Sequence, residues 1–401
     1  MIQGNFAVAQ SGGPTSAINA TLCGVIEGAF SQGRRIYGAV NGILGVINDS
    51  FTDLNITFSN MDNIQLLKTT PSAYLGSCRY KLPASEDNYE LYEKIFSNFK
   101  KHDVTMFIYI GGNDSMDTVR KLSAYSKKYN KGVYIVGVPK TIDNDLMNTD
   151  HTPGFGSAAK FVATAVSEIA RDCAVYADPS ITVIEIMGRN AGWLTAASAL
   201  ARSKTSDAPH LIYLPEKQLS VEKLINDVES CKARNMVIAV SEGIKNENGE
   251  YFSNLACNIS HDEFGHAQLS GSARVVENIL KEKFGIKTRS VELNVLQRCS
   301  SHFASRTDLD ESVKIGKAGA SAASEGMSGI VMGFKRTGNY SIDIITNNAT
   351  DVANLEKKVP DSYISSTFND VTDDFIEYCL PLVQGEPSII TEKGIPKHIA
   401  L

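Results

Sequence analysis

Short apolar runs rich in β-branched residues recur along the chain and alternate with segments that have the periodicity of amphipathic helices. Strands buried on both faces read as continuous apolar runs, so this alternation predicts parallel sheets with helices on both sides. The expected strands are residues 6–9, 106–110, 134–138, 181–186, 236–241 and 290–295. The expected helices are residues 17–30, 116–129, 158–175, 192–200, 221–235 and 274–284. The pattern predicts the α/β class, with doubly wound, mainly parallel sheets.

The length of 401 residues is enough for two domains. We expect residues 1–153, joined by a returning segment at about 297–340, to form one α/β domain, and residues 154–296 to form the second. Residues 341–401 are more polar and less periodic, which predicts an extension packed on the domains. Ligands of such sheets bind beyond the carboxyl ends of the strands. The loops that follow the expected strands are therefore where functional residues should lie.

Composition excludes several classes of protein. The net charge is −6 with acids and bases interspersed, so no basic face predicts binding to nucleic acid. No apolar run approaches the length of a membrane span, and the first residues do not have the pattern of a secretory signal. The seven cysteines are scattered without a C-x-x-C pair, which favours neither a disulfide framework nor a zinc site. A soluble, cytoplasmic protein is the expectation.

Glycine pairs follow two of the expected strands. Gly12 and Gly13 belong to QSGGPTSAIN, and Gly112 belongs to GGNDSMDT. Glycine lets the backbone approach an anion closely, and the start of the following helix offers free N–H groups. An ordinary tight turn is the alternative, with Asn113 or Asp114 as a plain helix cap. A phosphate-binding P-loop is excluded because the sequence contains no G-x-x-x-x-G-K-[ST].

A lysine and two carboxylates follow the strand at 134–138, in the sequence PKTIDND. Asp143 and Asp145 are two residues apart and would lie on the same side of an extended loop. Two close carboxylates can divide the work, one as general base and one near a cation such as Mg²⁺. Lys140 offers a compact positive charge to phosphoryl oxygens. A solvated acidic turn is the alternative, which Pro139 at the strand end disfavours.

A fourth loop, MGRNAGW, places Arg189 at the end of the strand at 181–186, where a guanidinium can bind phosphate with two hydrogen bonds. Further acids and cations follow strands or glycines elsewhere in the chain, namely Arg79, Glu242, Arg289 and Arg298. Four strand-end loops that hold glycine pairs, acids and cations together predict a phosphoryl-transfer site.

These motifs carry a resemblance. SGGPTSAIN, GGNDS, PKTIDND, MGR, the glutamate of SEG and the pair QR occur in the order found in the phosphofructokinases, and the chain is similar to that family over roughly residues 5–335. The similarity is closest to the pyrophosphate-dependent branch. It implies reversible transfer of a phosphoryl group from pyrophosphate to the C1 hydroxyl of fructose 6-phosphate, with Mg²⁺, in glycolysis or gluconeogenesis. It also implies a homodimer or homotetramer, with the active site in a cleft between a donor-binding first domain and a sugar-binding second domain.

The resemblance assigns roles to individual residues. Asp143 would accept the hydroxyl proton, and the other catalytic residues would be Lys140, Asp114, Thr141 and Arg189. The donor would be bound by Gly12, Gly13, Arg79, Gly112, Asp114 and Lys140. The sugar phosphate would be bound by Thr141, Ile142, Asp143, Met187, Gly188, Arg189, Glu242, Val295, Leu296, Gln297 and Arg298, with Arg289 reaching a neighbouring subunit's substrate. The metal would be bound by Asn113 and Asp145, although many relatives have an aspartate at the first position.

Two residues predict the choice of donor. The ATP-using branch of the family typically has glycine where this chain has Asp114 and Lys140. A carboxylate at 114 would repel the α-phosphate of a nucleotide and block its path. The lysine instead offers a cation to pyrophosphate.

The sequence leaves other functions open. ATP as the donor is the runner-up, and a non-catalytic regulatory subunit is the alternative without chemistry. The sequence GFGSAA at 154–159 matches a dinucleotide fingerprint, but it follows a polar loop and not a strand. The sequence HDEFGH at 261–266 offers metal ligands within an unpatterned polar loop.

Overall fold

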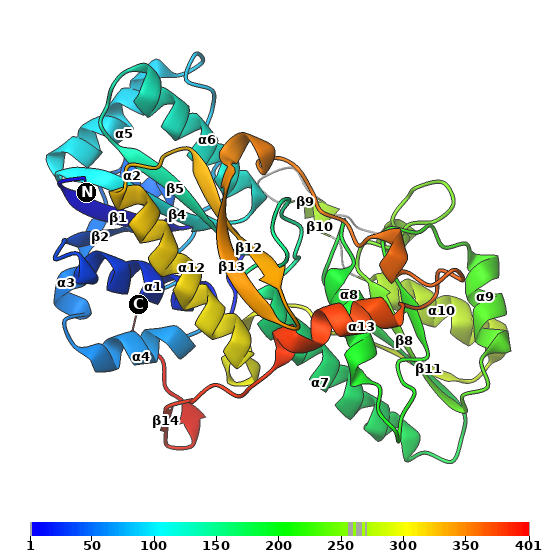
Figure 1. Ribbon diagram of the computed structural model, residues 1–401. Coiled ribbons are helices and arrows are strands. Elements are labelled where there is room, and N and C mark those ends of the chain that lie inside the picture. The colour runs from blue at the N-terminus through cyan, green and yellow to red at the C-terminus, as the bar shows by residue number, and fades with distance from the viewer. Residues whose placement is uncertain (1, 256–259, 262–266, 269–270, 401) are drawn as a thin grey trace. The chain divides into compact units, whose positions relative to one another are not determined.

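The computed structural model describes residues 2–255, 260–261, 267–268 and 271–400, and it divides into two compact units (Figure 1). Unit 1 comprises Met1–Ser157, Arg298–Glu356 and Gly385–Leu401. Unit 2 comprises Ala158–Gln297 and Lys357–Gln384. The stretch 341–401, expected to be one extension, is thus shared: its first and last parts belong to unit 1 and its middle part belongs to unit 2.

Unit 1 is built on a sheet with the strand order β13-β12-β5-β4-β1-β2-β3. The inner strands are parallel, while β3 and β13 pair antiparallel at the two edges. Residues 341–348 therefore form an edge strand of this sheet and not part of a separate extension. The strands are β1 (Asn5–Gln10), β2 (Ile36–Ala39), β3 (Phe51–Asp53), β4 (Val104–Gly111), β5 (Tyr134–Pro139), β12 (Ile330–Thr337) and β13 (Ser341–Asn348).

Alternate residues of these strands enter two separate hydrophobic cores, one on each face of the sheet. Phe6 and Val8 pack with α1, α4 and α12, whereas Ala7 and Ala9 pack with α2, α5 and α6. This is the doubly wound arrangement that wholly apolar strands predict. The helices of unit 1 are α1 (Ile18–Ser31), α2 (Ile43–Ile47), α3 (Leu54–Thr57), α4 (Met61–Thr69), α5 (Tyr89–Lys101), α6 (Asn113–Lys128) and α12 (Arg306–Ser324).

Unit 2 contains an all-parallel sheet with the order β11-β6-β8-β7. Helices α9 and α10 share a core with one face of it, and α8 packs against β7 and β8 beneath α13. The strands are β6 (Ser180–Ile186), β7 (Leu211–Tyr213), β8 (Asn235–Ser241) and β11 (Lys287–Glu292). The helices are α7 (Phe155–Ala174), which begins in unit 1, α8 (Trp193–Ala197), α9 (Val221–Ser230), α10 (Ser272–Phe284), α11 (Leu296–Cys299), which ends in unit 1, and α13 (Asp373–Cys379).

Shorter elements complete the described part of the chain. They are the 3₁₀ helices Ser198–Ala201, Phe252–Leu255, Ser301–Phe303, Ala349–Asp351, Asp361–Tyr363 and Leu380–Val383, and the two-residue strands β9 (Ser260–His261), β10 (Ala267–Gln268), β14 (Thr391–Glu392) and β15 (Ile395–Pro396). Among the described residues, no helix combines the length and the apolar character needed to cross a lipid bilayer.

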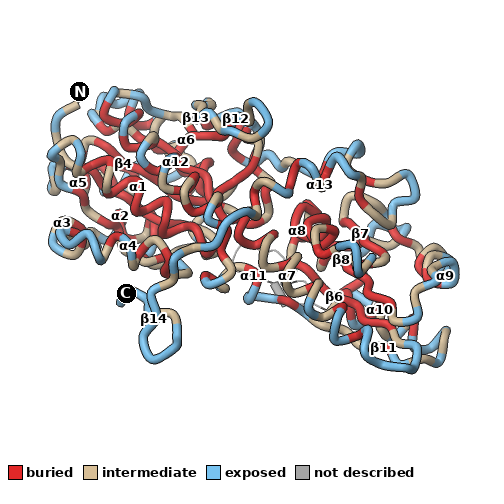
Figure 2. Tube along the Cα trace, turned by 60° about the horizontal axis from the view of Figure 1, so that its bottom comes forward, coloured by how far each residue is buried: buried red, intermediate tan, exposed pale blue. Residues whose placement is uncertain are grey.

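The predicted fold class is confirmed, since both main sheets are mainly parallel and alternate with helices. Figure 2 shows β4 and β8 buried almost along their length, as continuous apolar runs require. Several predicted boundaries are wrong. The helix expected at 192–200 is α8 followed by a 3₁₀ turn, and the helix expected at 221–235 ends at Ser230. The strand expected at 290–295 ends at Glu292, and the positive φ of 42° at Asn294 is incompatible with its continuation.

Helices α1 and α12 lie side by side and approach most closely at glycines. A Cβ at Gly316 would lie 2.2 Å from the carbonyl oxygen of Thr21, and a Cβ at Gly24 would lie 2.1 Å from that of Val313. Backbone atoms cannot move aside as a flexible side chain could. The crossing of these two helices therefore requires glycine on both.

We expect Gly316→Ala to lower the free energy of unfolding of unit 1 by about 1–3 kcal/mol. The cost of the backbone clash should exceed the gain of about 1 kcal/mol that alanine brings through its higher helix propensity. Chemical denaturation measures the change. Lys314→Ala, at an exposed position of the same helix, is the control and should stay within about 0.5 kcal/mol of the native chain. A Gly316→Ala protein as stable as the control would contradict the close approach.

Candidate active site

The loop after β1 brings two cations against its glycine pair. Gly12 has a positive φ of 77°, a conformation that favours glycine. A Cβ at Gly12 would lie 3.3 Å from Nζ of Lys140, and a Cβ at Gly13 would lie 3.3 Å from Nη1 of Arg298. The missing side chains leave room for both cations at the backbone of this loop.

The ammonium group of Lys140 is buried, with the residue only 2% exposed. Its Nζ donates a hydrogen bond of 2.5 Å to the carbonyl oxygen of Gly13. Burial lowers the pKa of Lys140 to about 8, against the opposing effect of Asp143 and in the same direction as the charge of Arg298. Asp145 and Arg79 have smaller effects on this pKa, the first raising it and the second lowering it. Two glycines of the donor loop and four charged residues of the predicted site thus contact this buried cation or act on its charge.

Residues 76–79 run along the other side of the donor loop. Ser77 Oγ donates to the carbonyl oxygen of Gly12 at 2.6 Å, and the amide of Gly12 donates to that of Cys78 at 3.5 Å. These bonds hold Ser77 and Cys78 against the donor loop, and the exposed Arg79 follows them directly in the chain.

The loop after β4 leads into α6. Lys140 also contacts this loop, because its backbone amide donates a hydrogen bond of 2.9 Å to the carbonyl oxygen of Gly111. Gly112 is the N-cap of α6 and Asp114 is exposed in the first turn, so neither Asn113 nor Asp114 caps the helix. The amide nitrogen of Asn113 donates to the carbonyl oxygen of Leu355 at 2.7 Å. Its Oδ1 is buried and accepts no hydrogen bond from the described residues.

The carboxylate loop is folded and not extended. Asn144 has a positive φ of 53° between the two aspartates, so the extended conformation that would place both carboxylates on the same side is not adopted. The turn is closed by Thr141, whose Oγ1 lies 3.1 Å from the amide of Asp143 and 3.5 Å from Oδ2 of that residue. Both Asp143 and Asp145 nevertheless act on the charge of Lys140.

Unit 2 builds a second loop, after β6, that needs glycine. Gly188 has a φ of 130°, and a Cβ there would lie 2.6 Å from the carbonyl oxygen of Ala191. The backbone is held by two predicted sugar-site side chains: the amide of Gly188 donates to Oε1 of Glu242 at 3.1 Å, and the amide of Met187 donates to Oε1 of Gln297 at 3.1 Å.

The backbone of Arg189 crosses the loop after β8 at close range. A Cβ at Gly243 would lie 1.8 Å from the carbonyl oxygen of Arg189, so only glycine fits there. Ser241 Oγ donates to the carbonyl oxygen of Gly188 at 2.5 Å and accepts from the amide of Gly243 at 3.0 Å. These contacts fix the backbone from which the guanidinium of Arg189 extends.

Arg289 lies away from this loop, on β11. Its guanidinium donates to Asp172 at 2.8 Å and to Thr182 Oγ1 at 3.1 Å, and hydrogen bonds to Cys173 and Asp172 raise its pKa. It lines a pocket of about 90 Å³ together with Lys287. The predicted role of Arg289 at a neighbouring subunit stays a prediction.

Comparisons with known proteins show the family of the chain. The family model described as Phosphofructokinase matches residues 5–301. The chain belongs to the phosphofructokinase family. The resemblance drawn from the motifs is thereby confirmed.

Three relatives illustrate where this phosphofructokinase stands. It is 38% identical over 408 residues to the pyrophosphate–fructose 6-phosphate 1-phosphotransferase of Xanthomonas campestris, covering 100% of this chain and 97% of the relative. It is 39% identical over 392 residues to the protein of the same name from Rhodospirillum rubrum, covering 96% and 95%. A crystal structure of the pyrophosphate-dependent phosphofructokinase from Nitrosospira multiformis matches with a TM-score of 0.90 and 35% identity, covering 99% and 96%.

The structure of this phosphofructokinase sorts the predicted residues into groups. In unit 1, Gly12, Gly13, Arg79, Asp143 and Asp145 contact Lys140 or act on its charge, and in unit 2 Met187, Gly188, Glu242 and Gln297 are joined by hydrogen bonds. Arg298, predicted with the sugar residues, lies at the donor loop beside Gly13. Val295 and Leu296 are 48% and 54% exposed.

Sequence reasoning did not single out Ser77 and Ser241, which bind the loop backbones directly. Their position next to functional glycines or acids was the only signal. The alternative metal site at 261–266 lies outside the residues whose side chains the structure describes.

The low pKa of Lys140 predicts proton uptake when pyrophosphate binds. The free protein loses this charge as the pH rises through about 8, whereas a bound anion stabilises the charged form. Affinity for pyrophosphate should therefore fall above pH 8, and binding there should take up a proton. Titration calorimetry in two buffers of different ionisation enthalpy counts the protons. The control Lys140→Met gives the number of protons taken up by pyrophosphate itself. Equal proton uptake by the native protein and by this variant would show that Lys140 does not take up the proton.

Proposed function

We propose that this phosphofructokinase transfers a phosphoryl group from pyrophosphate to the C1 hydroxyl of fructose 6-phosphate, giving fructose 1,6-bisphosphate and phosphate. The observation that carries the proposal is the buried ammonium of Lys140 at the glycine pair of the donor loop, with Asp143 acting on its charge. The names of the relatives, which are similar over the full chain, support pyrophosphate as the donor. We propose that the reaction is reversible.

Asp143 acts as the general base. The proton of the C1 hydroxyl passes to its carboxylate, the hydroxyl oxygen bonds to the nearer phosphorus of pyrophosphate, and the bridging P–O bond breaks to release phosphate. Negative charge on the transferring group is stabilised by Lys140, Arg298 and Arg79. Thr141 holds the amide of Asp143 and so orients the base.

The sugar phosphate is bound by the loop after β6. Arg189 provides a guanidinium for the phosphate, and Met187 and Gly188 line the sugar. Glu242 and Gln297 bind the backbone of this loop, which keeps it in one conformation. Their contribution to sugar binding is then partly indirect, through the loop they hold.

The residues at the start of α6 and in the carboxylate loop fit Mg²⁺. The buried Oδ1 of Asn113 has no hydrogen-bond partner among the described residues, and amide and carboxylate oxygens are suitable ligands. The described part of the chain has no group of three His, Cys, Asp or Glu side chains that could hold a metal ion, so the phosphates would have to supply further ligands. Asn113 and Asp145 would therefore hold Mg²⁺ together with the phosphates, and the ion would neutralise charge on the donor.

A cytoplasmic location and a homodimer or homotetramer complete the proposal. The six cysteines found in the described ranges are all free thiols, as expected in a reducing compartment. An oligomer is required if Arg289 reaches the substrate of a neighbouring subunit.

We expect Asp143→Asn to lower kcat by about 10²–10⁴-fold, because the amide keeps the shape of the carboxyl group but cannot accept the proton. Binding of fructose 6-phosphate, measured by calorimetry, should be retained. Asp62→Asn makes the same change at an exposed position of α4 and serves as the control. Native turnover in Asp143→Asn would exclude this residue as the base.

The donor is decided by comparing ATP and pyrophosphate in the native enzyme and in substituted proteins. Native enzyme should use pyrophosphate and use ATP very poorly. Asp114→Gly should raise the ratio of kcat/KM for ATP to that for pyrophosphate, and Lys140→Gly should mainly lower the value for pyrophosphate. In the double variant the ratio should change furthest in favour of ATP. The two changes should not be additive, because both residues act on one ligand.

Asp114→Asn separates the two causes of the block, since it removes the charge and keeps the volume. If the ratio of kcat/KM for ATP to that for pyrophosphate rises in Asp114→Gly but not in Asp114→Asn, the block is steric. If the ratio rises in both variants, the block is charge repulsion. A native preference for ATP, or an unchanged ratio in Asp114→Gly, would overturn the proposal of pyrophosphate as donor.

A further inference from the structure

The segment between the carboxylate loop and α7 touches both loops of the donor site. The amide of Thr141 donates to the carbonyl oxygen of Pro153 at 3.1 Å, and Thr152 Oγ1 donates to the carbonyl oxygen of Thr141 at 2.9 Å. Gly154 packs so closely on the donor loop that a Cβ there would lie 2.9 Å from Cγ2 of Thr15. The position of residues 152–154 therefore sets the position of Thr141.

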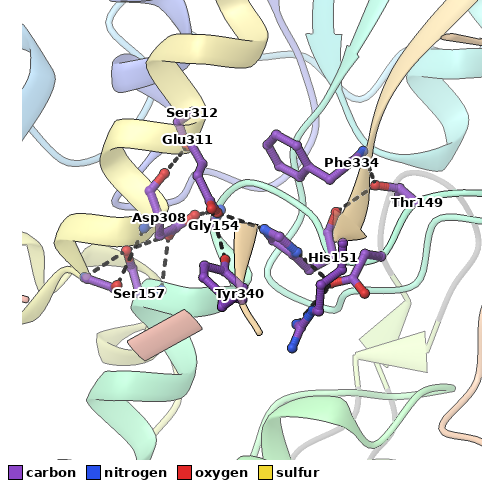
Figure 3. A network of polar contacts seen from close by, with 12 residues as sticks. Thr149, His151, Gly154, Ser157, Asp308, Glu311, Ser312, Phe334 and Tyr340 are labelled. Atoms are coloured by element: carbon purple, nitrogen blue, oxygen red, sulfur yellow. Dashed lines mark hydrogen bonds and ion pairs between the residues drawn. The ribbon is translucent and has the colours of Figure 1, made fainter. Parts of the chain in front are cut away.

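A buried carboxylate holds the end of this segment (Figure 3). Asp308, in the first turn of α12, is 4% exposed. It accepts hydrogen bonds from the amide of Gly154 at 2.9 Å, the amide of Ser157 at 3.0 Å and Ser157 Oγ at 2.5 Å. Burial raises the pKa of Asp308, against the opposing effect of these three donors. The proposed chemistry does not use this carboxylate.

One turn further along α12, Glu311 binds the other end of the segment. Both ring nitrogens of His151 contact carboxylates: Nδ1 lies 2.8 Å from Asp150 and Nε2 lies 2.9 Å from Glu311. Figure 3 shows the imidazole reaching toward Glu311, with Tyr340 beside that carboxylate. Arg336 pairs with Asp150 at 2.9 Å. Two carboxylates that accept from one ring favour the imidazolium.

We propose that Asp308 and the pair of His151 and Glu311 are positioning residues for phosphoryl transfer. Helix α12 holds residues 151–157 at two points, and these residues hold the backbone of Thr141, whose hydroxyl orients Asp143. The inference rests on the proposed function, because Asp143 must be the base for its position to matter.

The geometry predicts a loss in kcat more than in substrate affinity. The sugar-binding loop belongs to unit 2 and is held by other residues, Glu242 and Gln297. Displacement of a reacting group by about 1 Å costs about 10²-fold in rate. A residue that only supports the fold would instead lower stability and leave kcat at temperatures below unfolding unchanged.

The first test is Asp308→Asn, which keeps the volume but turns one of the acceptor oxygens into a donor facing the amides. We expect kcat to fall about 10- to 100-fold, with the KM for fructose 6-phosphate within about twofold of native. Hydrogen exchange at the amide of Thr141 should accelerate, and this readout needs no activity. Ser157→Ala, which removes one of the three donors, is the milder variant. Its kcat should lie between those of the native protein and Asp308→Asn.

Ser312→Ala is the matched control. Ser312 Oγ donates to the backbone carbonyl of Asp308 at 2.6 Å, so its loss removes a buried hydrogen bond from the same turn without touching residues 151–157. It should lower the melting temperature and leave kcat unchanged. A fall in kcat as large as in Asp308→Asn would make the effect structural and overturn the inference.

The second test uses pH at saturating concentrations of both substrates, where the effect of Lys140 on pyrophosphate binding is removed. Burial lowers the pKa of His151, but hydrogen bonds to Asp150 and Glu311 outweigh it and raise the pKa above the ordinary value. The positioning should be present at low pH and lost as the pH rises through that raised pKa. The charged groups facing the ring are Asp150, Glu311, Arg336, Tyr340 and Asp308.

Glu311→Gln lowers the pKa of His151 by removing one of its anions. The alkaline fall in kcat should therefore move to lower pH in this variant and stay in place in Ser312→Ala. The inference is refuted if the pH profile of kcat does not move in Glu311→Gln and kcat is unchanged in Asp308→Asn and Ser157→Ala. Turnover by the native enzyme would in that case still support the proposed function. Absence of turnover in the native enzyme would refute the proposed function instead.

Discussion

A positive charge is buried where the donor loop meets the carboxylate loop, and the surrounding backbone is arranged to accommodate it. Removing an ammonium from water costs several kcal/mol unless it is paired. Lys140 is compensated by the carbonyl oxygen of Gly13 and by the charges of Asp143 and Asp145, while Arg298 and Arg79 add further positive charge. Burial outweighs the effect of the two carboxylates and lowers the pKa of Lys140. A bound anion would favour the charged form of this lysine, which is the electrostatic basis of the proposed phosphate binding.

Close backbone approach is the means by which both units build their loops. In unit 1, glycines at 12 and 13 let Lys140 and Arg298 reach the main chain. In unit 2, Gly188 and Gly243 let the loops after β6 and β8 cross at distances that any side chain would prevent. The functional side chains can then extend from a backbone with little freedom to move, which is the condition for preorganised binding of a transition state.

Helix α12 connects the fold of unit 1 to its chemistry. One of its faces meets α1 at a glycine crossing, and α1 begins directly after the donor loop. Its first turns carry Asp308 and Glu311, which bind the segment that holds Thr141. The same helix therefore contacts structures that lead to both loops of the donor site. Its packing and its polar contacts are expected to act together.

The sequence by itself determined the α/β class, because wholly apolar strands and amphipathic helices have distinct periodicities that local residues specify. It also indicated which loops are the candidates for the site, since the carboxyl ends of parallel strands meet at one edge of a sheet. Lys140 and Asp143 became candidate site residues in this way, although the folded turn at Asn144 was not predicted, because a positive φ depends on surrounding contacts.

Only the tertiary structure decided the remainder. It placed residues 341–348 at the edge of the first sheet and Arg298 at the donor loop. It also paired His151 with Glu311, 160 residues further along the chain. Neither residue type nor spacing specifies such partners, because contacts between distant segments are set by how helices and strands pack and not by local pattern.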